Sequence, residues 1–173
     1  MEKAEYRRQY IRKTLLGASA PVTASQFAET LKVSRQIIVG DVAILRASGL
    51  DIISTPRGYT AAVSENDYPY TGMIACMHDS SMLRDELYAI VDFGATVIDV
   101  TIEHAIYGEL SGKLELSSRY DVDNFIEKVK KEKNSTPISA LTGGVHLHRI
   151  GCKNSETLEL IRARLTEMGI AIS

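Results

Sequence analysis

Helix start and stop signals divide the first 63 residues into short segments, and this division constrains the fold more than any other feature of the sequence. The apolar periodicity predicts three helices, over about 4–16, 24–31 and 34–48. Thr23 and Ser34 are suitable N-cap residues for the second and third helices, and glycines follow the first and the third. Two predicted strands, about 50–54 and 59–63, flank the turn Pro56-Arg57-Gly58. We therefore expect three short helices followed by a β-hairpin.

The pattern changes after a polar segment at 64–70, which we interpret as a linker. Strands and helices then alternate in the order βαββαβα, over about 71–78, 81–93, 95–106, 112–116, 122–132, 138–152 and 155–168. This order resembles a ferredoxin-like split βαβ sandwich with an added C-terminal helix. The sequence thus predicts an α+β chain with domains at 1–63 and 71–173.

The charge is divided unevenly between these two parts. Residues 1–64 contain 9 Lys and Arg against 5 Asp and Glu, whereas residues 65–173 contain 11 against 17. The net charge of −2 therefore combines a basic first part with an acidic remainder. Such an asymmetry favours a nucleic-acid-binding module joined to a domain of another kind.

Three helices and a hairpin follow one another in the order of a winged helix-turn-helix domain. In that arrangement the third helix enters the DNA major groove with its first residues at the base edges. Arg35 and Gln36 stand at this position, where Arg can bind guanine and Gln can bind adenine. Ser34 can contact a phosphate at the helix start, and Arg57 lies at the tip of the predicted wing. Further phosphate contacts are expected on the first helix, from Arg7, Arg8, Arg12 and Lys13.

The segment 31–46, Leu-Lys-Val-Ser-Arg-Gln-Ile-Ile-Val-Gly-Asp-Val-Ala-Ile-Leu-Arg, resembles the helix-turn-helix of biotin-repressor type. It departs from that pattern at Gly40, where such helices more often carry a longer polar residue. A glycine inside a helix costs about 1 kcal/mol and removes one base contact. The alternative interpretation is a three-helix bundle that binds protein.

Four side chains in the second part form a candidate metal site. His146 and His148 flank Leu147 on a predicted strand, so that both imidazoles lie on one face. His78 ends another strand, and Glu86 lies on the helix that follows it. Imidazole and carboxylate ligands suit zinc, nickel, cobalt or iron(II). Histidines without a metal role remain the alternative.

The second part also resembles the three-histidine regulatory domain, through Met77-His78-Asp79, Glu86, the run 102–108 and the run 141–148 that contains Gly-Gly-Val-His-Leu-His. With the predicted winged helix in front, nearly all of the chain is similar to the niacin-responsive repressors of NAD biosynthesis and niacin uptake. The resemblance implies a homodimer that binds operator DNA when nicotinic acid is present. It further implies one divalent transition metal per chain (zinc, nickel or iron), held by His78, Glu86, His146 and His148.

Other residues are expected to bind the nicotinic acid. His104 matches the remaining histidine of the family, although Ala105 replaces the proline that commonly follows it. Arg84 and Arg149 lie close in sequence to the proposed metal ligands and can pair with the carboxylate of the effector. Tyr107 can stack on the pyridine ring. The alternative for each arginine is a solvated surface charge.

Two further expectations concern assembly and location. We expect the second domain to form the dimer surface. One candidate surface is an apolar stripe on the last predicted helix, formed by Leu158, Ile161, Leu165 and Met168. The alternative is that this stripe packs on the sheet of its own domain. No apolar run approaches the roughly 20 residues that span a membrane, and the first residues lack the core of a secretory signal, so we expect a cytoplasmic protein. Cys76 and Cys152 are then expected to be buried thiols.

Three other function classes compete with a niacin-responsive repressor. One is a regulator for which the metal ion itself is the signal, and a second is a small-ligand sensor with a different effector. The third is an enzyme fused to a DNA-binding head. We expect no enzyme, because the second part shows neither a phosphate-binding glycine motif nor an arrangement of nucleophile and base.

Overall fold

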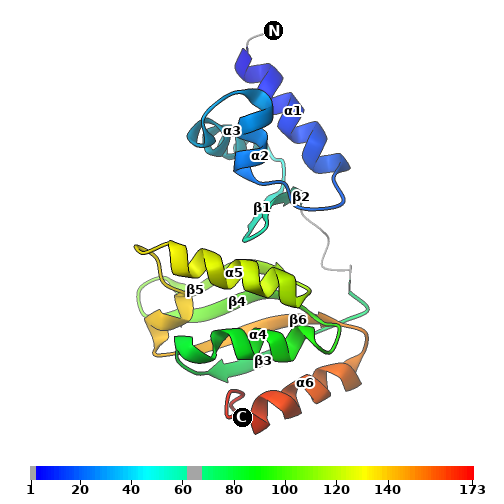
Figure 1. Cartoon of the computed structure of the whole chain (residues 1–173), viewed down its shortest axis with the longest axis vertical. Helices are drawn as coiled ribbons and strands as arrows, with labels where there is room; N and C mark the ends of the chain where they lie inside the picture. Colours follow the sequence, from blue (N-terminus) through cyan, green and yellow to red (C-terminus); the bar gives the residue numbers. More distant parts are fainter. Residues whose placement is uncertain (1–2, 62–67) are drawn as a thin grey trace. The chain divides into compact units, whose positions relative to one another are not determined.

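The computed structural model describes residues 3–61 and 68–173. The chain separates into two compact units, residues 1–64 and 65–173 (Figure 1). We call them the helical unit and the sheet unit and describe each by itself. The α+β class is confirmed.

The helical unit contains the three helices and the hairpin that the helix caps and turn residues of the sequence predict. They are α1 (Lys3–Gly17), α2 (Ala24–Leu31), α3 (Arg35–Ala47), β1 (Ile52–Thr55) and β2 (Gly58–Ala61). Thr23 and Gln26 form a reciprocal capping box at α2, and the Ser34 hydroxyl accepts from the amide of Ile37 at α3. One face of each helix packs into a single core, with Ile11, Leu15, Phe27, Ile38, Val42, Leu45 and Ile52.

An ion pair between a partly exposed arginine and a buried carboxylate joins α1 to α3. The Arg7 Nε lies 2.7 Å from the Asp41 Oδ2, and a second Arg7 nitrogen lies 3.3 Å from Oδ1. Arg8 lies 3.7 Å from the same carboxylate, which is only 3% exposed. The structure therefore places Arg7 and Arg8 beside this carboxylate, and the phosphate contacts expected from both stay a prediction.

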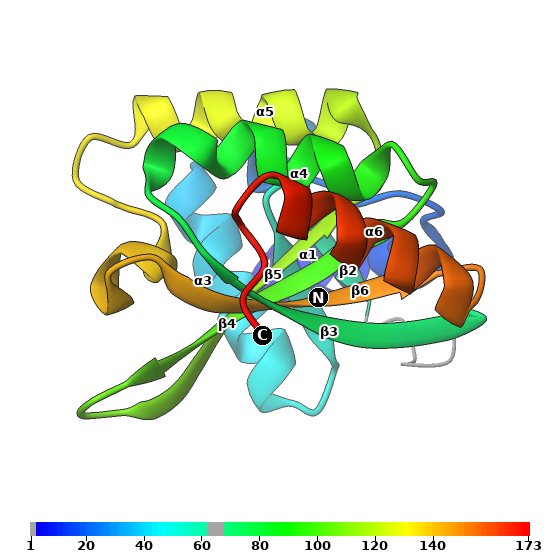
Figure 2. The ribbon, with the colours of Figure 1, turned by 90° about the horizontal axis from the view of Figure 1, so that it is seen from below.

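The sheet unit is a two-layer sandwich. Its strands are β3 (Tyr70–Met77), β4 (Thr96–His104), β5 (Gly108–Leu116) and β6 (Val145–Cys152). Its helices are α4 (Leu83–Val91), α5 (Arg119–Lys131) and α6 (Ser155–Glu167), with short 3-10 helices η1 (Ser80–Met82) and η2 (Ile138–Thr142). All three α-helices cover the same face of the sheet (Figure 2).

The strands are all antiparallel in the order β3-β6-β4-β5. The predicted element order βαββαβα is confirmed, but the strand order differs from the ferredoxin-like one, because the second and fourth strands of the unit are central instead of the first and third. Burial explains the difference. Nearly every residue of β4 from Thr96 to Ile102 is buried, as in a central strand, whereas β5 alternates between exposed and covered positions.

Two predicted boundaries also change, and so does the expected role of α6. The strand expected over 138–152 begins only at Val145, because η2 and two glycines with positive φ, Gly143 and Gly144, precede it. Strand β5 begins at Gly108, four residues earlier than expected. The apolar stripe of α6 packs on its own unit, since Leu158, Ile161 and Leu165 are at most 4% exposed, and it is therefore not a free dimer surface.

No helix within residues 3–61 and 68–173 combines the length and the apolar character needed to cross a lipid bilayer.

Candidate functional site

Three imidazoles converge on one buried carboxylate in the sheet unit. The Glu86 side chain on α4 is fully buried, and its Oε2 lies 2.7 Å from the Nε2 of His78, which directly follows β3. Its Oε1 lies 2.9 Å from the Nε2 of His146, and Oε2 lies 3.4 Å from the Nε2 of His148. The four residues that the sequence suggested as metal ligands thus form one cluster beneath the helices.

The glycines before His146 permit this approach of the two strands. A Cβ on Gly144 would lie 2.2 Å from the carbonyl oxygen of His78, and its φ is +96°. Its carbonyl oxygen lies 2.7 Å from the Nδ1 of His146. The run Gly-Gly-Val-His-Leu-His therefore ends η2, brings β6 against His78 and orients one imidazole of the cluster.

The tautomers of the histidines leave their Nε2 atoms directed at the cluster centre. Each Nδ1 faces a backbone carbonyl: His78 that of Asp79 at 2.7 Å, His146 that of Gly144, and His148 that of Asp99 at 2.9 Å. Because a carbonyl only accepts, each Nδ1 donates its proton, as the second ring nitrogen of a metal-bound histidine does to the groups around it. The buried Nε2 of His148 has no hydrogen-bond partner among the described residues. Three nitrogens and a carboxylate in this arrangement fit a divalent transition metal.

The electrostatics of the cluster also favour a cation. Burial raises the pKa of Glu86, but the charge of His148, whose Nε2 lies 3.4 Å away, and the hydrogen bonds with His146 and His78 outweigh it and hold that pKa far below its usual range. Burial lowers the pKa of His148 and His78, yet the Glu86 carboxylate raises both above the ordinary value. The cluster therefore keeps its negative charge and stabilises a positive charge beside it.

Cys76 is a member of the cluster that the sequence did not indicate. Its Sγ and ligand atoms of Glu86 and His146 all lie within 4.8 Å of one another. Burial, followed by the charge of Glu86, raises the pKa of its thiol. Cys76 pairs with His146 only through the register of β3 and β6, which no spacing in the sequence reveals.

The four residues suggested as effector contacts lie in different places. The rings of His104, the last residue of β4, and Tyr107, in the turn to β5, stack at 5.1 Å, and His104 pairs with Gly108 of β5. Arg84 lies on α4, 3.4 Å from a carboxylate oxygen of Asp123. Arg149 donates to Asp99 at 2.6 and 2.9 Å, and strand alternation places it on the sheet face opposite His148.

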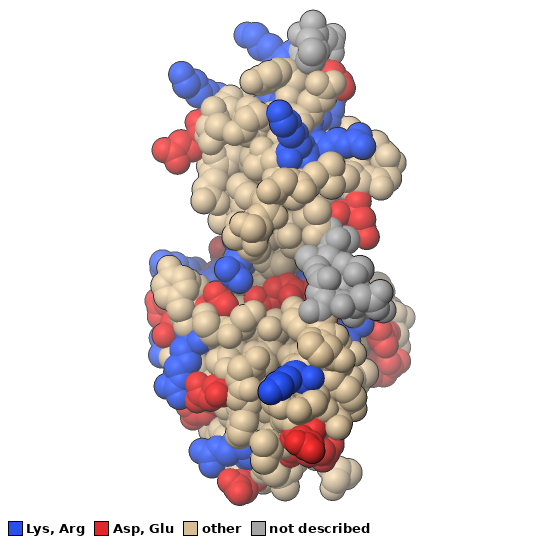
Figure 3. Space-filling view, turned by 90° about the vertical axis from the view of Figure 1, so that its right-hand side faces the viewer, with Lys and Arg blue, Asp and Glu red and all other residues tan. Residues whose placement is uncertain are grey.

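The suggested DNA contacts lie on two elements of the helical unit. Arg35 and Gln36 are exposed in the first turn of α3, directly after the cap Ser34. No atom lies within 4 Å of a Cβ placed on Gly40, so that the outer face of α3 is open there. Arg57 is exposed in the β1–β2 turn. On the face that Figure 3 presents, Lys and Arg side chains project from the helical unit.

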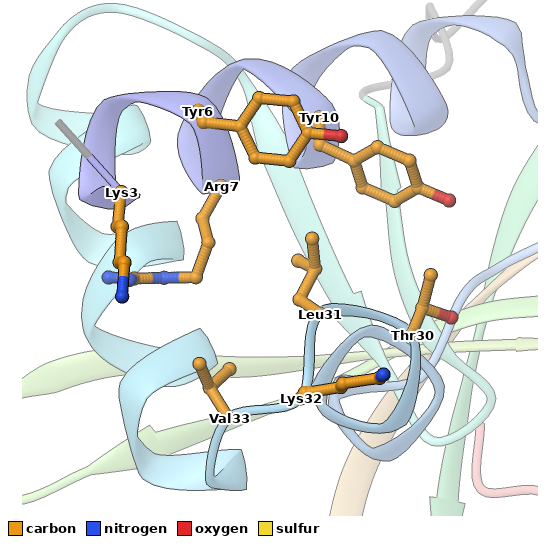
Figure 4. A pocket seen from close by; sticks show the side chains of 8 residues that line it. All are labelled: Lys3, Tyr6, Arg7, Tyr10, Thr30, Leu31, Lys32 and Val33. Carbon is orange, nitrogen blue, oxygen red and sulfur yellow. The ribbon is translucent and has the colours of Figure 1, made fainter. Parts of the chain in front are cut away.

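A shallow groove lies beside the turn that precedes α3 (Figure 4). Residues of α1 line one side, and the end of α2 with its turn lines the other: Lys3, Tyr6, Arg7, Tyr10, Thr30, Leu31, Lys32 and Val33. Lys3 and Lys32 give the groove a basic rim, consistent with a place next to a DNA backbone.

Comparisons with known proteins agree with this division. A 3H domain model matches residues 71–173, and an HTH domain model matches residues 7–60. The probable transcription repressor NiaR of Thermotoga maritima is 39% identical over 152 residues, 88% of this chain and 85% of that protein. The transcription repressor NadR of Bacillus subtilis is 36% identical over 168 residues, 96% of this chain and 93% of that protein.

A helix-turn-helix unit followed by a 3H domain defines a DNA-binding transcription regulator and not an enzyme. The 3H match covers more than half of the residues, and the chain therefore belongs to the 3H-domain family. The resemblance drawn from the histidine motifs is confirmed at this level.

Proposed function

We propose that the protein represses transcription by binding operator DNA in response to nicotinic acid, and that it controls genes of NAD biosynthesis and niacin uptake. The observation that carries this proposal is the cluster of three Nε2 atoms and one carboxylate in a unit joined to a helix-turn-helix. The names of the two similar repressors support the DNA-binding part. Such a regulator acts in the cytoplasm.

The proposed cofactor is one divalent transition metal per chain, zinc, nickel or iron. His78, Glu86, His146 and His148 would hold it, and their mixed nitrogen and oxygen donors suit these borderline ions. An ion held by these residues would supply Lewis-acid binding for the pyridine nitrogen or the carboxylate of nicotinate. The protein contributes the fixed tautomers and the buried negative charge of Glu86.

The proposed effector contacts are His104, Tyr107 and Arg84. The exposed ring of Tyr107 already stacks on an imidazole and offers the same surface to a pyridine. Arg84 would exchange its partly exposed partner Asp123 for the effector carboxylate. We leave Arg149 out of the proposed effector contacts, because its guanidinium binds Asp99 on the sheet face opposite to His148.

We propose further that the protein is a homodimer on a two-fold operator. One helix-turn-helix contributes a small interface, and a dimer aligns two such units with two half-sites. In each half-site Arg35 and Gln36 read base edges, while Ser34 and Arg57 contact the backbone or the minor groove.

A second candidate is a regulator that responds to the metal ion alone. The burial of the cluster favours it, because the side chains of His146, His148 and Glu86 are at most 2% exposed. A sensor for another small ligand would use the same site.

The test measures the affinity of the full chain for a duplex that it selects from a randomised pool. Fluorescence anisotropy compares chelated protein with zinc- or nickel-loaded protein, each with and without nicotinate or nicotinamide. Tighter binding only with metal and nicotinate together supports the proposal. A response to metal alone supports the second candidate, and a response to nicotinate after complete chelation excludes the metal from the sensor.

A further inference from the structure

Glu115 in β5 adopts a backbone conformation that residues with a Cβ rarely adopt. Its φ is +51°, and among the described residues the only other non-glycine with positive φ is Lys32, which ends α2, where this conformation is common. Val97 pairs with Leu116 and Asp99 with Lys113, so that two residues of β5 stand opposite one of β4. Glu115 thus belongs to a β-bulge, a feature often found beside functional sites.

The side chain of Glu115 connects this bulge to the start of the sheet unit. Its carboxylate accepts a hydrogen bond from the Tyr68 hydroxyl at 3.0 Å. The ring of Tyr68 lies where a side chain on Gly151 would stand, since a Cβ there would be 2.4 Å from the ring. Tyr68 is the first described residue after 62–67, the segment of sequence that joins the two units.

Asp99 connects the same bulge to the histidine cluster. Its carbonyl oxygen accepts the Nδ1 proton of His148 at 2.9 Å. Its buried carboxylate accepts from Arg149 and lies 3.6 Å from the Lys113 ammonium. The charges of Lys113, Asp99 and Arg149 also act on the Glu115 carboxylate. The hydrogen bond from His148 thus ends at Asp99, which borders the bulge in the pairing of β4 with β5, and the bulge carries Glu115 with its hydrogen bond from Tyr68.

We propose that Glu115 and Tyr68 are positioning residues of the regulator, through which the state of the histidine cluster reaches the segment 62–67. The inference rests on the proposed function, in which this cluster is the sensing site. Binding at the Nε2 of His148 reorients the imidazole and thereby changes the hydrogen bond from its Nδ1 to Asp99. The bulge beside Asp99 interrupts the regular pairing of the sheet. We expect its backbone to shift when this hydrogen bond changes. A sensor of this kind works by shifting the population of two arrangements of the bulge.

A double-mutant cycle tests the connection without effector or operator. Hydrogen exchange of the backbone amides at 62–72 is measured by mass spectrometry in the full chain, with chelator present, for the wild type, His148→Gln, Tyr68→Phe and the double variant. We expect His148→Gln to change the exchange rate about fivefold or more when the Tyr68 hydroxyl is present, and less than twofold in the Tyr68→Phe background. An equal change in both backgrounds overturns the inference.

A second variant removes the carboxylate and relaxes the backbone. In Glu115→Gly the positive φ carries no strain, so that the thermal stability should not fall. The effect of His148→Gln on 62–72 should nevertheless be lost, as in Tyr68→Phe. The matched control is Glu109→Gln, which removes an exposed charge from the same strand and should preserve the effect. Preservation of the effect in Glu115→Gly contradicts the proposal.

These outcomes separate the inference from the proposed function. If nicotinate does not change operator affinity in the wild type while the cycle shows coupling, the proposed effector is wrong and the connection stands. If nicotinate shifts operator affinity but the cycle shows no coupling, the bulge is not the route.

Discussion

The buried carboxylates Asp41 of the helical unit and Glu86 of the sheet unit are compensated in different ways. Asp41 in the helical unit is 3% exposed and is held by the guanidinium of Arg7, with Arg8 nearby. Glu86 in the sheet unit is fully buried and faces three imidazoles. A guanidinium keeps its proton at every physiological pH, whereas an imidazole gains or loses a proton near neutrality or gives its lone pair to a metal.

The difference separates a structural ion pair from an exchangeable site. The Arg7–Asp41 pair joins α1 to α3 through contacts of the guanidinium with both carboxylate oxygens. The Glu86 cluster keeps a buried Nε2 without a hydrogen-bond partner in the described residues. A buried charge therefore indicates a ligand site only when its partners can change their state.

Removing two imidazoles gives the largest expected effect. His146→Ala combined with His148→Ala should reduce the metal content from about one transition metal per chain to none, because two of the three nitrogens are lost. Nicotinate-dependent repression should disappear, while weak binding to operator DNA persists through the separate helical unit. Elemental analysis and anisotropy measure the two results.

The control for this variant is His104→Ala. The Nδ1 of His104 accepts from amides of its own turn, and we expect the metal content to stay unchanged. A double variant that retains both metal and a normal nicotinate response would show that Glu86 and its histidines form a structural cluster like the pair at Asp41.

Breaking the structural pair should cost stability instead. Arg7→Ala leaves Asp41 buried with only the more distant Arg8, and the free energy of unfolding should fall clearly more than it does in Arg12→Ala. Arg12→Ala removes an exposed arginine from the same helix and should change it by less than about 0.5 kcal/mol. Urea unfolding compares the two variants. An equal loss of unfolding free energy in Arg7→Ala and Arg12→Ala would mean that the ion pair with Asp41 does not stabilise the fold.

The sequence predicted the cluster better than the pair, and the reason is spacing. His146 and His148 alternate on one strand, and Glu86 follows His78 by eight residues, so that local periodicity brings ligands together. Arg7 and Asp41 lie 34 residues apart on two helices, and only their packing joins them. The same limit hid Cys76 and the strand order, because both depend on which strands become neighbours. The helix caps at Thr23 and Ser34 were predictable because capping is local.

The arginines of the helical unit should also differ in role: some stabilise the fold and others bind DNA. Arg35 is exposed at the start of α3, and Arg35→Ala should weaken binding at its cognate base by about 1–3 kcal/mol while leaving the free energy of unfolding nearly unchanged. Anisotropy with the selected duplex and with single-base variants of it measures the loss. Unchanged affinity for every duplex would reject α3 as the reading helix.

Arg57 should have a smaller and less selective effect. Its place in the hairpin turn suits a phosphate, so that Arg57→Ala should weaken all duplexes alike. The slope of log affinity against log salt concentration should flatten by about one unit. A loss confined to one base position would instead place Arg57 among the base-reading residues.

The smallest expected effect is a pH dependence confined to the sheet unit. Burial raises the pKa of Glu115, which faces Tyr68, Lys113, Asp99 and Arg149, above its ordinary value of about 4.5. A raised pKa in the folded state means that the group stabilises the fold fully below about pH 4.5 and that this contribution is lost as the pH rises through the folded pKa. The difference in unfolding free energy between the wild type and Glu115→Gln should therefore decrease with rising pH in this range. The difference in unfolding free energy between the wild type and Arg7→Ala serves as the control. It should not change with pH from pH 5 upwards, because the guanidinium does not titrate there. Urea unfolding at several pH values measures both differences. If the difference between the wild type and Glu115→Gln does not change with pH, the Glu115 carboxylate is solvated like that of an ordinary surface residue.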